Sequence, residues 1–302
     1  MTRAAVRAAG ALLAAWLAVW GAPLPASACA VCACGDPTLT VVGTEQPYAG
    51  RFRLALEARL RSDDVGDPKL DRVELEEQRL ELKVAWSPLE ELMIFASVPY
   101  LRRDVTFVNG GRDTRYRFGD PELLAKVFLW RDRSFGPRHL LAWTTGVRFP
   151  FAPVDRGPDG VILPAELQGG TGAFAVSVGP TYAYFDGAWS FYASALGVYT
   201  FAGRFDFHPG PSLRTTVAVQ WQALDVLAVR PVVDTRLDAR AEDSGQADPD
   251  SGGFIAFVGA DFVLSPVTDL LFVLGVRAPV LNALHGAHRE GWIGSLGLAY
   301  DL

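Results

Sequence analysis

Apolar and polar residues alternate one by one along much of this sequence. Between 51 and 61, Phe52, Leu54, Leu56, Ala58 and Leu60 occupy the even positions, and all but one of the odd positions are charged. The same period returns at 79–86, 213–222 and 227–238. Because successive side chains of a strand point to opposite faces, each segment predicts a strand with one apolar and one polar face.

The composition also favours strands over helices. Half of the residues are hydrophobic, and 30 glycines, 20 prolines, 18 phenylalanines, 8 tyrosines and 8 tryptophans stand beside only 2 methionines. This mixture is typical of twisted strands joined by many turns, so the sequence predicts an all-β fold.

The first 28 residues resemble a secretory signal peptide. Arg3 and Arg7 precede an apolar run over 8–21, and Ala26-Ser27-Ala28 matches a cleavage site. Removing the two arginines leaves 26 basic and 34 acidic residues, a net charge of −8 with no concentrated basic face, which argues against a nucleic-acid partner. We therefore divide the chain into a signal peptide (1–28), a Cys-bearing periplasmic segment (29–44) and one barrel domain (45–302).

Turn residues divide that domain into about twelve segments, each long enough for a tilted strand to cross a bilayer. The expected strands are 51–61, 72–86, 92–105, 119–130, 139–150, 172–185, 188–201, 212–223, 225–238, 253–264, 269–280 and 291–302. Short links follow the even-numbered strands, and longer polar links follow the odd-numbered ones, at 62–71, 106–118, 151–171, 202–211, 239–252 and 281–290. Short periplasmic turns and longer external loops are typical of outer-membrane barrels.

A soluble β-sandwich would share the alternation, so other features must separate the two folds. The ordered connections and the terminal strand favour a transmembrane antiparallel barrel, with its apolar face toward outer-membrane lipid. Aromatic residues near strand ends, where membrane interfaces lie, favour it as well; they include Trp86, Tyr100, Trp130, Phe149, Trp189, Tyr199, Trp221 and Trp292.

The last strand resembles the C-terminal signal that the barrel-assembly machinery of Gram-negative bacteria recognises. Ser295, Gly297, Tyr300 and Leu302 match its four positions, with Leu in place of the more usual Phe. In length, strand pattern and recurring hairpins such as Trp86-Ser87-Pro88-Leu89 and Leu264-Ser265-Pro266-Val267, the chain resembles a group of outer-membrane proteins assigned to transport in the phenol-degradation MetA pathway. This resemblance implies a porin-like channel or transporter for a small solute of aromatic or hydrophobic character.

Charged residues on the polar faces would be costly in lipid, so we expect them to face the lumen. There they could brace the interior or select the solute. These lumen-facing candidates are Arg53, Glu57, Arg59, Arg79, Glu81, Lys83, Glu122, Lys126, Arg148, Arg214, Arg230, Asp234, Arg236, Asp261 and Arg277.

All three cysteines lie within six residues, at Cys29, Cys32 and Cys34. A disulfide, lipidation of Cys29, soft-metal binding and a redox role all remain open. No His follows Cys32 or Cys34 in the pattern of covalent haem attachment, and the sequence predicts no cofactor. An alternative function follows, in which the barrel anchors this segment for a periplasmic redox or metal partner.

Two further features concern chemistry. His285 and His288 form an H-x-x-H in the last long link, where we expect a solvated loop rather than a metal site. A lipid-modifying enzyme, of the kind that uses a serine and a histidine on the outer barrel surface, is the remaining alternative. No His and Ser fall at matched strand positions and no G-x-S-x-G is present, so we expect no enzyme.

Overall fold

The computed structural model describes residues 49–66, 72–134, 136–156, 168–203, 207–243, 245–248 and 251–302. The predicted signal peptide and the Cys-bearing segment lie outside these residues. Thirteen long or moderately long strands make up the main sheet: β1 (Phe52–Val65), β2 (Val73–Leu89), β3 (Leu92–Phe107), β4 (Arg112–Phe118), β5 (Glu122–Arg131), β6 (His139–Arg148), β7 (Ala175–Asp186), β8 (Trp189–Thr200), β10 (Ser212–Leu224), β11 (Leu227–Asp238), β14 (Gly253–Val267), β15 (Leu270–Leu284) and β16 (Arg289–Asp301). Three two-residue strands, β9 (Phe207–His208), β12 (Glu242–Asp243) and β13 (Gln246–Ala247), form a small separate sheet.

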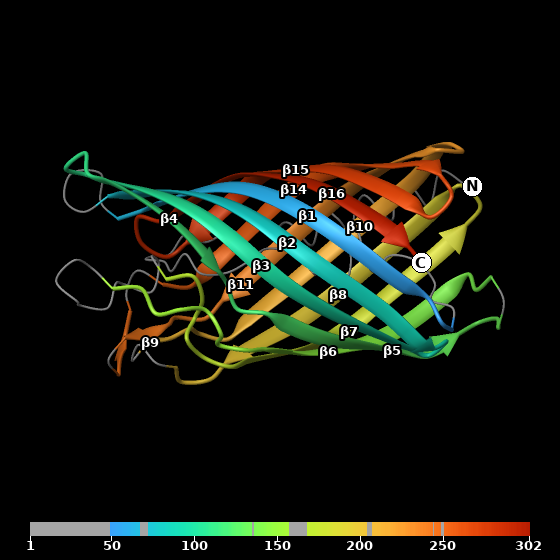
Figure 1. Cartoon of the computed structure of the whole chain (residues 1–302), viewed down its shortest axis with the longest axis horizontal. Coiled ribbons are helices and arrows are strands. Elements are labelled where there is room, and N and C mark those ends of the chain that lie inside the picture. Colours follow the sequence, from blue (N-terminus) through green and yellow to red (C-terminus); the bar gives the residue numbers. More distant parts are fainter. Residues whose placement is uncertain are drawn as a thin grey trace, which may run out of the picture.

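The main sheet closes into a barrel. Neighbouring strands pair antiparallel in the order β2-β1-β16-β15-β14-β11-β10-β8-β7-β6-β5-β3, and β2 pairs with β3 to close the ring of twelve. Figure 1 shows the strands tilted steeply across the wall. This confirms the predicted all-β, twelve-strand antiparallel barrel, and each predicted strand overlaps one strand of the ring.

Two predicted loops differ from the structure. The link expected over 106–118 contains β4, which continues the antiparallel pairing along β3 from Tyr100↔Phe118 to Thr106↔Arg112. The link expected over 281–290 shrinks to four residues, because β15 runs on to Leu284 and β16 begins at Arg289. The residues of β4 and the first two residues of β16 are mainly polar and resemble a loop, whereas β15 continues through Leu281 and Leu284 beyond the turn that was expected there.

The wall has an apolar outside and a polar inside. On β1, Leu54, Leu56 and Leu60 are 42–57% exposed, whereas the intervening Arg53 and Glu57 are at most 3% exposed. A soluble protein would bury the leucines and expose the charges. The exposed apolar residues of the other strands extend this face around the barrel, where hydrocarbon can cover it.

Nowhere in the described part of the chain is there a helix long and apolar enough to cross a membrane.

Aromatic rings gather near both ends of the barrel. Near the short turns, Trp189 stacks on Trp221 with ring centroids 6.0 Å apart, and the His139 Nδ1 lies 2.6 Å from the Tyr182 hydroxyl. Near the long connections, the rings of Phe149 and Phe174 lie 5.9 Å apart. Two such groups are the arrangement expected where a barrel meets the two membrane interfaces.

The tight turns all lie at one end. Figure 1 shows them at the right-hand end, together with the start of β1 and the end of β16, and it shows the longer connections at the left. Gly187, with φ of 60°, forms the β7–β8 turn, and Asp269, with φ of 67°, forms the β14–β15 turn. Both φ values lie in the left-handed region that Gly and Asp adopt most readily in hairpins. The predicted asymmetry of short turns and longer connections is therefore present, except at the β15–β16 link.

Candidate functional site: the barrel lumen

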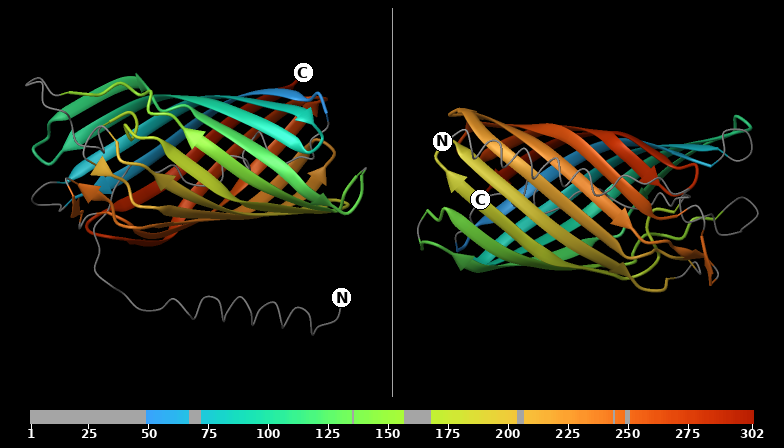
Figure 2. Two further views of the ribbon diagram at one scale, coloured as in Figure 1. Left: turned by 90° about the horizontal axis from the view of Figure 1, so that it is seen from below. Right: turned by 180° about the vertical axis from the view of Figure 1, so that it is seen from behind.

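An apolar layer crosses the lumen near the short turns. It is a single cluster of buried or half-buried side chains, and every strand of the ring contributes to it. Its large members are Met93, Phe95, Leu124, Phe128 and Leu140, together with Tyr192, Phe185, Val232, Val263, Leu271 and Val273, and alanines at 55, 85, 142, 183, 218 and 299 fill the space between them. Several members flank the tight turns directly, which places the layer at that end of the barrel. Both views of Figure 2 show these turns gathered at one end of the barrel.

Ion pairs line the lumen on β1, β2 and β3. Lys83 Nζ lies 2.7 Å from Glu57 Oε2, and Arg59 binds the other oxygen of Glu57 at 2.9 Å. Further along the same strands, Arg61 and Arg103 both donate to Glu77, at 3.1 and 2.6 Å. Each acceptor thus holds two cations, so these buried charges compensate one another across neighbouring strands.

A second network joins β10, β11, β14, β15 and β16. Arg230 and Arg277 converge on Asp261 at 2.9 and 2.7 Å. Arg277 also reaches Asp234 at 2.9 Å, and Thr216 donates to Asp234 at 2.6 Å. Next to it, Arg236 bridges Asp238 and Glu290.

The wall between the two networks is lined by hydroxyl groups. Thr144 on β6, Thr181 on β7 and Ser194 on β8 are at most 7% exposed, and their hydroxyl oxygens have no hydrogen-bond partner within the described ranges. Thr181 lies directly opposite Ser194, which lies directly opposite Thr216 on β10. The interior is therefore asymmetric, with charged strands on two sides of a hydroxylated one.

Each residue that the sequence nominated for the lumen lies on the buried side of its strand. Nine are at most 7% exposed: Arg53, Glu57, Glu81, Lys83, Lys126, Arg214, Arg230, Asp234 and Arg236. The side chains of Arg59, Arg79, Arg148 and Arg277 are 16–23% exposed, and Asp261 is 4% exposed. Arg148 meets Glu122 at 3.9 Å, a weak contact, and Lys126 lies over the Phe128 ring at 5.8 Å. These residues are packed far more tightly than an open, water-filled porin lumen would require.

Sequence reasoning missed several inner-face residues. Asp301, the second-to-last residue of the sequence, binds Arg51 and Arg53 at 2.7 and 2.6 Å. Glu77 and Arg103 lie in the halves of β2 and β3 that are farther from the short turns, and the predicted set of lumen residues included neither of them. Asp301 stands between the apolar residues Tyr300 and Leu302, which was an available signal, whereas Glu77 and Arg103 stand among polar residues and had none. The apolar layer gave no signal, because its members are ordinary Ala, Leu and Phe residues on separate strands.

The expectation of a solvated H-x-x-H loop is wrong. His288 is 3% exposed, and neither of its ring nitrogens has a hydrogen-bond partner in the described structure. Burial lowers the pKa of His288 to about 4, against the opposing effect of nearby Glu290. The four-residue turn causes the burial, since it draws His288 onto the end of the ion-paired lumen. No group of three or more His, Cys, Asp and Glu side chains suited to a metal is found among the described residues.

Comparisons with known proteins are consistent with this architecture. No protein-family model and no curated protein sequence matches the chain. Among solved structures, an outer-membrane channel from Pseudomonas putida F1 superposes with a TM-score of 0.69 at 11% identity, covering 89% of this chain and all of the other. The chain therefore has the fold of an outer-membrane β-barrel.

A second solved structure extends the comparison. The transport unit of the autotransporter AIDA-I from Escherichia coli gives a TM-score of 0.51 at 9% identity, covering 87% of this chain and 93% of that one. At such identities the similarity establishes the fold alone. Both of these proteins are named for transport rather than for catalysis.

Proposed function

We propose that this barrel is a channel or transporter that passes a small solute across the outer membrane. The apolar layer across the lumen is the observation that carries the proposal. A barrel that served only as an anchor would need no special layer there, since charged or small residues could fill it equally well. The overlap with an outer-membrane channel over almost the whole chain supports the same function.

The layer also bears on the kind of solute. A charged group entering a ring of Phe95, Phe128 and Tyr192 would lose its hydration without gaining a partner, which is costly. An aromatic or aliphatic group would exchange water for favourable apolar contacts. We therefore propose that the solute presents an apolar or aromatic part to this layer.

The tight packing of the lumen supports a closed resting state. Arg236 and Lys126 are 1% and 3% exposed, and an added Cβ on Gly146 would lie only 2.3 Å from Leu124 Cδ2. Passage then requires side chains of the apolar layer to move aside. Rotation of aromatic side chains is the smallest change that would open it, because the backbone forms a closed ring of paired strands.

The test compares inner and outer phenylalanines. The purified full chain is reconstituted into planar bilayers and liposomes, alongside a double variant Phe95→Ala/Phe128→Ala. The matched control is Phe262→Ala/Phe272→Ala, which removes two exposed rings from the outer face. We expect rare, small current events from the parent protein, a several-fold larger conductance from the inner double variant, and no change from the outer one.

Two results would oppose the proposal. If neither the parent nor the inner variant gives current or solute uptake while both remain folded, the barrel is not a channel. In that case the function of anchoring the Cys-bearing segment at 29–44 would be favoured. Equal effects from the inner and outer variants would show that the apolar layer does not control passage.

A further inference from the structure

A buried carboxylate without a hydrogen bond lies at the end of β1 that is farther from the short turns. Asp63 is 3% exposed, and both of its carboxylate oxygens are buried with no hydrogen-bond partner among the described residues. Arg61 Nη1 lies 3.4 Å from Asp63 Oδ2, whereas Arg61 Nε donates to Glu77 at 3.1 Å. A buried carboxylate that no donor meets is costly to keep ionised.

A second buried carboxylate faces it across the β1–β16 seam. Glu290 is 4% exposed and lies directly opposite Asp63 in the antiparallel register. The Cβ atoms of directly opposed residues are about 4.5–5.5 Å apart, so two inward-facing carboxyl groups at this position can meet. Glu290 receives a hydrogen bond from Arg236 at each of its oxygens. When two carboxylates share one buried site, the second one ionises only at considerable cost.

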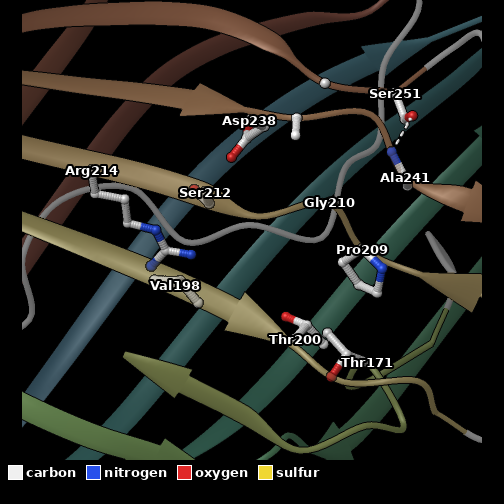
Figure 3. Close-up of a pocket in the computed structure, with 12 residues that line it drawn as sticks. Thr171, Val198, Thr200, Pro209, Gly210, Ser212, Arg214, Asp238, Ala241 and Ser251 are labelled. Atoms are coloured by element: carbon white, nitrogen blue, oxygen red, sulfur yellow. Dashed lines mark hydrogen bonds between the residues drawn. The ribbon is translucent and has the colours of Figure 1, made fainter. Parts of the chain in front are cut away.

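The cations around Asp63 already hold other carboxylates. The charged and titratable side chains of this cluster are Arg61 on β1, Glu77 on β2, Arg103 on β3, Arg236 and Asp238 on β11, and His288 and Glu290 on β16. Arg61 and Arg103 both donate to Glu77, and Arg236 bridges Asp238 and Glu290. The next strand of the ring is β10, whose Arg214 lines a pocket together with Asp238 (Figure 3). Asp63 is the one carboxylate of the cluster that receives no hydrogen bond in the described structure.

This part of the seam lies beyond the apolar band of the outer face. Leu60 is 57% exposed toward lipid, but the next outward-facing residues of β1 are the polar Ser62 and Asp64. Asp64 lies opposite another polar residue, Arg289 on β16. The cluster is therefore level with the external solution rather than with the hydrocarbon, and protons reach it from that side.

We propose that this cluster binds one proton, held between Asp63 and Glu290 across the β1–β16 seam. The proton is bound to an oxygen of Asp63, and the resulting O–H donates to Glu290, which stays ionised beside Arg236. Oxygens without exposed surface admit no solute, and no group suited to a metal ion is found among the described residues. A proton fits, because it needs no space beyond that of a hydrogen bond. Burial lowers the pKa of His288, so its ring stays neutral and does not carry this proton.

Infrared spectroscopy of the full chain in detergent detects the proton directly, because the C=O stretching band of a carboxylic acid is separate from the bands of carboxylates. At pH 6, ordinary carboxyl groups with pKa values of about 4 are almost entirely ionised. We expect the band of one buried acid at pH 6 and its disappearance at higher pH. Asp63→Asn should remove the band. The matched control is Asp64→Asn, which replaces the adjacent outward-facing carboxylate, 44% exposed, and should leave the band unchanged.

A folded parent protein without this band at pH 6, or equal losses in the two variants, would overturn the proposal. If Asp63→Asn does not fold, Asp63→Glu replaces it; this variant keeps the acid and should shift the frequency of the band, and an unshifted band would contradict the assignment to Asp63. None of these outcomes depends on whether the barrel conducts, so the proton site and the channel function are tested separately.

The pH dependence of unfolding provides a second measurement. The folded chain holds a proton that the unfolded chain releases above about pH 4, so this contribution to stability is lost as the pH rises. Relative to Asp63→Asn, the folding equilibrium constant of the parent should fall at least tenfold between pH 5 and pH 8. His288 is present in both proteins, so its opposite contribution cancels in this ratio. An unchanged ratio would contradict a proton bound at Asp63.

Discussion

Asp261 is the carboxylate on which two arginines of the lumen converge, and replacing it tests how the interior is held together. Arg277 would keep a second acceptor, Asp234, at 2.9 Å. Arg230, which is 3% exposed, would keep none, since Asp261 is the one carboxylate that contacts it among the described residues. The substitution Asp261→Asn therefore leaves a buried, uncompensated guanidinium.

The expected loss of stability follows from this geometry. At the observed 2.9 Å, the attraction between Arg230 and Asp261 is about 6 kcal/mol at an effective dielectric constant of about 20. Part of that attraction offsets the desolvation of the two charges, so removing one partner should lower the free energy of unfolding by about 3–5 kcal/mol. Arg230→Met should cost less, about 1.5–3 kcal/mol, because Asp261 retains Arg277.

The double variant provides the decisive comparison. Asp261→Asn/Arg230→Met leaves no unpaired charge at this position, so it should be more stable than Asp261→Asn alone by about 2 kcal/mol. Unfolding by urea in phospholipid vesicles, followed by tryptophan fluorescence, measures the free energy of unfolding of the two single variants and the double variant. The exposed pair of Arg72 and Asp64 is the control, and it should contribute less than about 1 kcal/mol. If Arg230→Met destabilises the Asp261→Asn protein further, the pairing argument is refuted.

Three further predictions concern the outer face, the packing and the pH dependence. Leu56→Arg, on the lipid-facing side of β1, should lower the free energy of unfolding by about 2–4 kcal/mol in vesicles, and a change below about 1 kcal/mol would contradict a lipid-facing position. Gly146→Ala should cost about 1–3 kcal/mol, because the new methyl group would press on Leu124 and on the Ser177 hydroxyl, and the shortened variant Leu124→Ala should relieve the part due to Leu124 in the same urea titration. The pKa of His288 is about 4 in the fold and about 6.5 when unfolded, so the unfolded chain binds more protons between these values. Stability should therefore fall by up to about 3 kcal/mol as the pH drops from 6.5 to 4, and a His288→Leu protein should lose that part of the slope.

Much of the fold could be predicted from the sequence, and rather little of the site. The alternation on β1 and β2 indicated which residues share a face, and the turn residues indicated where most strands end. The strand β4 was not predicted because most of its residues are polar, so that its sequence resembles a loop. The burial of His288 was not predicted because it depends on a four-residue turn, whereas the sequence indicated a ten-residue link.

The sequence by itself determined that the chain makes twelve strands with one apolar and one polar side, because a strand's side chains alternate whatever its surroundings. It did not determine which inner residues meet. Phe95 and Phe128 join one apolar layer, and Arg230 and Asp261 pair, only because the barrel closes with a particular register and tilt. The register and the tilt decide how high each inner side chain lies along the barrel axis, and both are properties of all the strands together. The apolar layer and the ion-paired walls are therefore consequences of the tertiary structure.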